Sequence, residues 1–175
     1  TWTGGEEIGV LLDGMTDAKK DVMDASGKAE PADAGNTIYW KNTAEASVQV
    51  WYPYRTDSPV NISDQSGGYA DFDLLYATAR GRYDQEINLR FNHRMAKVEV
   101  TLAAGDDITE EELDGATVKI YGVWEVKFID GSVNPKKSTY GEIKPYHDGA
   151  TKKFEAVMAP QNTTGKVLIE IGIGG

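Results

Sequence analysis

Apolar and polar residues alternate with a period of two along much of this chain. The segment 86–91 carries its apolar residues at odd positions, whereas the segment 96–102 carries them at even positions. Such alternation is typical of half-buried β-strands. Because the phase shifts by one residue, the backbone must bend or bulge between the two segments. We therefore predict a corner at residues 92–95, where the chain passes from one sheet to another, with His93 in a structural role there.

Other segments have the same strand character and are separated by turn signals such as Asp13-Gly14. Helix signals are few: Thr109 and Glu112 have the spacing of a capping box, and residues 16–25 are compatible with a short surface helix. The pattern predicts an all-β fold, a Greek-key antiparallel β-sandwich with about seven or more strands and one or two short helices. The length favours a single domain over residues 1–175. The further strands are expected at residues 7–12, 46–54, 72–77, 116–129, 153–158 and 166–173.

Composition narrows the range of partners. The 175 residues include 28 acidic and 18 basic side chains, which gives a net charge of −10, and they include no cysteine. An acidic chain repels phosphate backbones, so nucleic acid is not an expected partner. Without cysteine there are no disulfides, thiolate zinc sites or cysteine nucleophiles. The longest apolar runs are shorter than the roughly 18 residues of a spanning helix.

Catalytic signals are weak. His93 and His147 are the only histidines, and neither accompanies a serine elbow. Neither of the glycine-rich patterns that cradle phosphates occurs, and no pair of carboxylates stands out. We therefore expect no enzymatic activity and no cofactor.

Two acidic stretches of the sequence are candidate cation sites. The stretch 106–114 fits a solvated, capped helix better than a calcium loop, because it lacks alternating oxygen ligands and a central glycine. In the stretch 64–73, acids flank a glycine turn, so it is the better calcium candidate, although an ordinary loop with Asx turns is favoured. We expect no metal site, and calcium at residues 64–73 is left open.

Aromatic residues gather in the segment 39–54. One interpretation is a platform on which sugar rings stack, formed by Trp40, Trp51, Tyr52 and Tyr54. The other, which we favour, is that these rings fill the core and its ends, since large aromatic side chains contribute much of the buried surface of a core. The period of the pattern does not reveal their exposure.

Several blocks of sequence, in a fixed order, resemble the fimbrillin-like proteins of Bacteroidales surface pili and fimbriae. Residues 73–77 followed by 87–100 resemble the family signature DLL-A … L-F-H-L-A-K-V, with Met95 where leucine is usual. The resemblance extends over residues 8–171. Weaker blocks lie at residues 8–10, 50–53, 115–118 and 154–161.

The resemblance implies a transthyretin-like sandwich that is the N-terminal domain of a longer protein. It also implies a non-catalytic subunit or accessory protein of a type V pilus, exported as a lipoprotein, extracellular, and held at the outer membrane only by a lipid anchor outside this chain. The implied partners are other fimbrial subunits, bound through a donated β-strand, and a host or bacterial surface protein or glycan. No basic residue precedes Lys19 and no lipobox cysteine is present, so neither processing site is carried over. The alternative is a surface glycan-binding module that uses Trp40, Trp51, Tyr52 and Tyr54.

Overall fold

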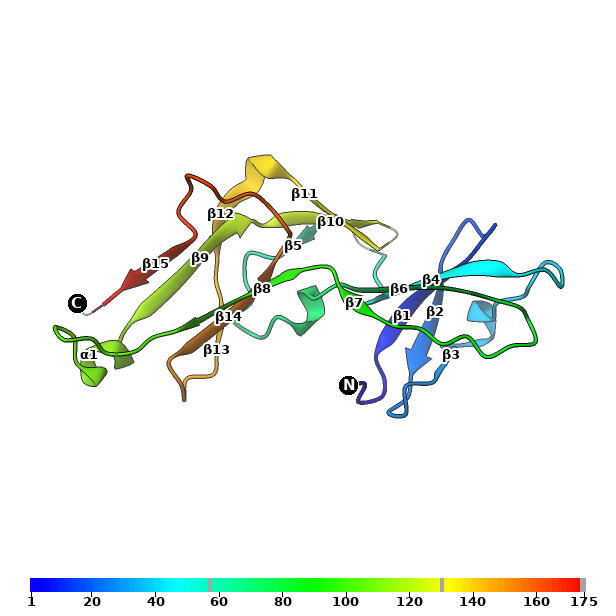
Figure 1. Ribbon diagram of the computed structural model, residues 1–175, viewed down its shortest axis with the longest axis horizontal. Coiled ribbons are helices and arrows are strands. Elements are labelled where there is room, and N and C mark those ends of the chain that lie inside the picture. The colour runs from blue at the N-terminus through cyan, green and yellow to red at the C-terminus, as the bar shows by residue number, and fades with distance from the viewer. Residues whose placement is uncertain (57, 130, 174–175) are drawn as a thin grey trace. The chain divides into compact units, whose positions relative to one another are not determined.

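The computed structural model describes residues 1–56, 58–129 and 131–173 (Figure 1). These residues form antiparallel strands, one α-helix and short 3-10 turns, so the all-β class is confirmed. The transthyretin-like Greek-key order of the strands stays a prediction.

The chain divides into two compact units, each built from separate stretches of sequence. Unit 1 comprises Thr1–Asp57, Asp73–Arg94 and Ile129–Ser132. Unit 2 comprises the rest, namely Ser58–Phe72, Met95–Phe128 and Val133–Gly175. The prediction of a single domain over residues 1–175 stays a prediction.

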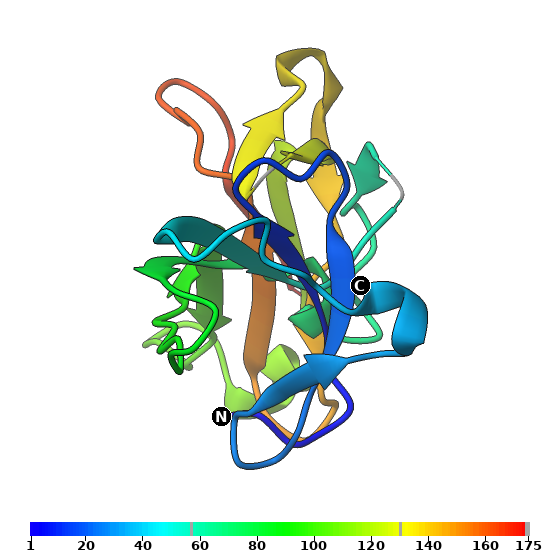
Figure 2. The same ribbon diagram turned by 90° about the vertical axis from the view of Figure 1, so that its right-hand side faces the viewer.

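Unit 1 is organised by a six-stranded antiparallel sheet in the order β3-β2-β1-β4-β6-β7 (Figures 1 and 2). Alternation in β4 turns Val48 and Val50 into the core and Gln49 and Trp51 to the other face. The core also contains Ile8, Val10, Leu12 and Met23. The strands are β1 (Glu7–Leu12), β2 (Lys19–Met23), β3 (Ala29–Pro31), β4 (Ala46–Tyr52), β6 (Leu75–Gly81) and β7 (Asn92–His93), and a 3-10 turn, η1, covers Ala34–Asn36.

Unit 2 contains small antiparallel sheets in the orders β12-β9-β15 and β13-β14-β8, and most of a third, β11-β10-β5. Ile120, Val126 and Ile143 are fully buried in it. The strands are β5 (Val60–Asn61), β8 (Ala96–Thr101), β9 (Thr117–Val123), β10 (Glu125–Ile129), β11 (Ser132–Pro135), β12 (Tyr140–Ile143), β13 (Tyr146–His147), β14 (Lys153–Met158) and β15 (Ile169–Gly172). The helical elements are α1 (Glu110–Asp114), η2 (Ala70–Phe72) and η3 (Lys137–Thr139).

The predicted change of sheet at residues 92–95 is confirmed. The chain leaves the sheet of unit 1 after β7, which pairs with β6, and enters another sheet at β8, which pairs with β14. Met95, which lies between β7 and β8 in the sequence, is buried. The Nδ1 of His93 lies 2.7 Å from the carboxylate of Asp73, within unit 1, and the structural role of His93 stays a prediction.

Two predicted elements are wrong. The expected helix at residues 16–25 contains a strand, β2, because the turn after β1 brings it into antiparallel register with Glu7–Val10. Residues 86–91 form no strand, although Ile87, Leu89 and Phe91 pack against the core of unit 1 as their alternation predicted. The alternation of apolar residues in 86–91 therefore predicted correctly which side chains are partly buried, but it did not predict whether the segment pairs with a strand. The short helix α1 is confirmed with its capping box, in which Thr109 and Glu112 bond reciprocally.

Candidate functional site

An apolar row lies exposed along the last described strand. Val167, Ile169, Ile171 and Ile173 keep 58%, 38%, 45% and 38% of their surface exposed. We call these four residues the edge row. They recur at every second position, so they share one face of β15 and its flanking residues. Contiguous exposed apolar surface of this kind is typical of an interaction site.

The edge row lies on the core-forming face of its sheet. Ile169 is opposite Ile120 of β9, and Ile171 is opposite Val118. Directly opposed residues point to the same face, and both partners on β9 are buried. Among the described residues, β15 pairs with β9 alone, so its other edge is free. The apolar face of this sheet therefore continues from the buried residues of β9 to the exposed side chains of the edge strand β15.

The opposite face of β15 is polar and fixes its register. Glu170 lies 3.6 Å from the ammonium of Lys119 and accepts a hydrogen bond of 3.2 Å from the hydroxyl of Tyr121. These contacts hold β15 against β9 by its outer face. They leave the edge row and the unpaired main chain of β15 available to a further strand.

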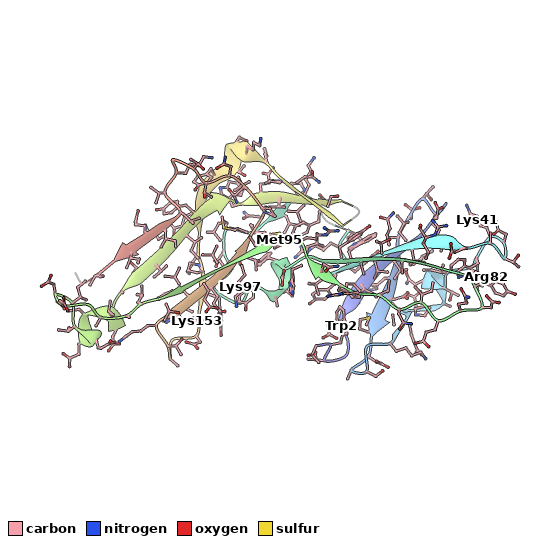
Figure 3. The ribbon with its side chains drawn as sticks, in the orientation of Figure 1. Trp2, Lys41, Arg82, Met95, Lys97 and Lys153 are labelled. Carbon is pink, nitrogen blue, oxygen red and sulfur yellow. The ribbon has the colours of Figure 1, made fainter. Side chains whose placement is uncertain are left out.

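The edge strand β8 of the same unit differs sharply from β15. A charged ladder of Lys97 and Glu99 on β8 with Lys153 and Glu155 on β14 covers its outer face. Figure 3 labels the two lysines of this ladder. Lys153 lies 2.9 Å from Glu99 and 3.0 Å from Glu155. Hydrogen bonds from Lys97 and then Lys153 hold the pKa of Glu155 below its ordinary value. Lysine on an edge strand discourages further pairing, so β8 is protected where β15 is not.

Unit 1 contains a groove of about 730 Å³ between the β2–β3 hairpin and the segment 86–91. Its apolar lining includes Trp2, Met23 and Leu89. The ring of Trp2 meets Tyr52 and Phe91 edge to face, at centroid distances of 5.6 Å and 5.2 Å. Residues 86–89 and 91 line the groove, and among the described strands none pairs with the segment 86–91.

The four aromatic candidates do not lie on one face. Trp40 and Tyr52 pack against the core of unit 1. Trp51 lies on the opposite face, over Gly9, where an added Cβ would come within 2.5 Å of the indole ring. Tyr54 has the ammonium of Lys20 at 5.9 Å from its ring centroid. The four rings therefore do not form one shared surface. Glycan binding by any of them stays a prediction.

The calcium candidate at residues 64–73 begins with an Asx turn. Asp64 accepts hydrogen bonds from the backbone and the hydroxyl of Ser66, at 3.0 Å and 2.6 Å. The Ser66 hydroxyl is the first cause of the lowered pKa of Asp64. Across residues 1–56, 58–129 and 131–173 no group of three or more His, Cys, Asp or Glu is arranged to hold a metal ion.

Sequence reasoning missed the role of Gln65 in that loop. Its side chain is fully buried in unit 2, where the amide donates to Val157 O (2.7 Å) and Ile62 O (3.1 Å) and accepts from Val157 N (2.9 Å). The side chain thus substitutes for a neighbouring strand beside β14. Gln65 stands between Asp64 and Ser66 in a polar stretch of sequence, where nothing local indicates burial.

No helix within the described part of the chain has both the length and the apolar character needed to cross a bilayer.

Comparisons with known proteins give one family model and several solved structures of similar fold. A family model described as fimbrillin-like matches residues 1–175. Among solved structures, a candidate cell adhesion protein from Bacteroides uniformis is 25% identical with a TM-score of 0.79, and the match covers 99% of this chain and 74% of that one. Candidate cell adhesion proteins from Bacteroides ovatus (18% identity, TM-score 0.65) and Bacteroides thetaiotaomicron (17%, 0.61) share the fold, each over 99% of this chain and 68% of theirs. No protein of curated function matches.

Proposed function

This chain belongs to the fimbrillin-like family, and on that premise we propose that it is a non-catalytic structural or accessory subunit of a cell-surface filament, a type V pilus. It acts in filament assembly and adhesion, outside the cell, after export as a lipoprotein. The descriptions of similar structures as candidate cell adhesion proteins support this proposal.

The edge row is the observation that carries the proposal. A strand donated by another subunit would pair with the free edge of β15 and cover the four apolar side chains of the row. Full burial of one such side chain stabilises by roughly 1.5–3 kcal/mol, so covering the exposed part of each contributes about 1 kcal/mol. The main-chain hydrogen bonds of the new ladder add to this, and alternating pockets along the strand select an apolar donor. The groove of unit 1 is a second surface that fits an extended segment.

Because the chain has no cysteine, a single introduced cysteine reports on one position only. We would replace Ile171 by cysteine, attach an environment-sensitive fluorophore, and follow its emission as the full-length protein assembles. We expect a blue shift in filaments, since the position becomes buried. A label on Thr164→Cys, an exposed loop position in the same unit, should not shift.

The matching genetic test places Ile171→Lys in the full-length gene in a Bacteroides host. We expect roughly tenfold fewer filaments by electron microscopy, which corresponds to a loss of about 1.4 kcal/mol per junction. Thr164→Lys should leave the count unchanged. Unaltered filaments in a correctly folded Ile171→Lys protein, or a label at position 171 that stays exposed in filaments, would contradict the proposal.

A further inference from the structure

A small pocket in unit 2 has no part in the proposed assembly surface. It has a volume of about 240 Å³ and lies between the end of β9, the end of β11 and the segment 160–166. Its walls combine apolar and polar side chains. They are Val123, Pro135 and Pro160 on the apolar side, and Lys137, Gln161, Asn162 and Lys166 on the polar side.

The two lysines of this pocket differ from most lysines around them. Five other lysines of unit 2 have a carboxylate within 4 Å, namely Lys97, Lys119, Lys136, Lys152 and Lys153. Within the described chain, Lys137 and Lys166 have none, as is also true of Lys127 and Lys144, although the protein carries 28 acidic residues. Lys166 instead lies over the ring of Tyr140, at 4.2 Å from its centroid. The pocket therefore concentrates uncompensated positive charge in an acidic molecule.

The amide side chains of the pocket are held in place. Gln161 accepts a hydrogen bond from Val123 N and donates to Ala159 O, both at 3.0 Å. Asn162 accepts from Thr164 N at 2.8 Å, which orients its amide nitrogen as a donor. Fixed amides beside two ammonium groups can bind hydroxyl and carboxylate oxygens together.

We propose that this pocket binds one acidic sugar unit, a pyranose ring that carries a carboxylate. The volume is below the roughly 300–1,000 Å³ of sites for drug-sized ligands, so it accepts a single ring. The carboxylate would lie between Lys137 and Lys166, the hydroxyls would meet Gln161 and Asn162, and the C–H face would pack on the prolines. An acidic peptide side chain matches the charge equally well, but it has no hydroxyls for the amides.

The test titrates the full chain with methyl β-D-glucuronide and follows the backbone amides of Val123 and Gln161 by NMR. A ligand of this size is expected to bind with a Kd on the order of 1 mM. The neutral methyl β-D-glucoside, which carries a hydroxymethyl group in place of the carboxylate, should bind roughly tenfold more weakly.

Matched variants separate the pocket from general surface charge. We expect Lys137→Gln and Lys166→Gln each to weaken glucuronide binding about fivefold. Lys127→Gln removes an equal charge from an exposed position of the same unit outside the pocket, and it should leave the Kd unchanged. Equal binding of glucuronide and glucoside, equal effects of all three variants, tighter binding of N-acetyl-glutamate methylamide, or no shift at about 10 mM ligand would each overturn the inference. None of these results bears on the edge row.

Discussion

The packing of Trp51 on the outer face of unit 1 requires a glycine at position 9. The two residues are directly opposite each other on β1 and β4, and the indole lies where any side chain at position 9 would project. We expect Gly9→Ala to destabilise the protein by about 1–3 kcal/mol, the usual effect of overpacking. Urea unfolding measures this change.

A double-mutant cycle tests the cause. In a Trp51→Ala background the space above position 9 is empty, so Gly9→Ala should become neutral or stabilise by about 0.5–1 kcal/mol, because alanine loses less entropy than glycine in a strand. An equal loss in both backgrounds would mean that the indole is not what excludes the methyl group.

Gln65 is the second position at which one side chain carries unusual weight. Gln65→Met keeps the length of the side chain but leaves buried N–H and C=O groups of Val157 without a partner. We expect a loss of roughly 2–4 kcal/mol in the free energy of unfolding. Gln85→Met, on the exposed surface, should change it by less than about 0.5 kcal/mol. Matching losses for the two variants would contradict the role assigned to Gln65.

At the scale of elements, the charged ladder on β8 and β14 makes stability depend on pH. The pKa values of Glu99 and Glu155 are lowered from 4.5 by hydrogen bonds from Lys153 and Lys97. Since the unfolded chain then binds more protons in acid, this stabilisation is present above pH 4.5 and is lost as the pH falls through the folded-state values. Asp21 acts in the opposite direction, because burial raises its pKa.

The measurement compares urea midpoints at neutral pH and below pH 4.5. Wild-type protein should lose stability on acidification, and Glu155→Gln should lose less, because it has already lost the ladder contact. Glu45→Gln is the reference, since its exposed ion pair with Arg80 lies in unit 1. A wild-type and a Glu155→Gln curve that run parallel would show that the ladder does not titrate with folding.

Periodicity revealed most strands but not all of their pairings. The strands at residues 7–12 and 153–158 have the predicted bounds because regular alternation and turn signals coincide there. Residues 19–23 lie within the short surface helix expected at residues 16–25, but their ladder with β1 makes them a strand. Segment 86–91 is the opposite case. Its clear period of two identifies the partly buried side chains, but among the described strands none pairs with it.

The candidate sites were harder to predict than the fold. The alternation at residues 166–173 indicated a strand, but only the register with β9 shows that its isoleucines extend the core face to a free edge. Lys137 and Lys166 are far apart in sequence, and nothing local relates them to Pro160. Sites that depend on which strands are neighbours require the tertiary structure.

For the whole molecule, the net charge of −10 opposes association of identical copies. Raising the salt concentration shortens the Debye length from about 30 Å at 0.01 M to about 10 Å at 0.1 M, so repulsion weakens. We expect assembly followed by the label at Ile171→Cys to accelerate several-fold over this range. A rate independent of salt would indicate that charge does not limit the encounter.

The division of the chain into interleaved units has a consequence for its biosynthesis. Unit 1 receives its last segment, Ile129–Ser132, only after much of unit 2 has left the ribosome, and unit 2 starts at Ser58, long before unit 1 is complete. Unit 1 is therefore incomplete until residue 132 has been synthesised, and unit 2 until the stretch that begins at Val133 has followed. We expect both units to fold late during translation, because neither is a continuous stretch of sequence.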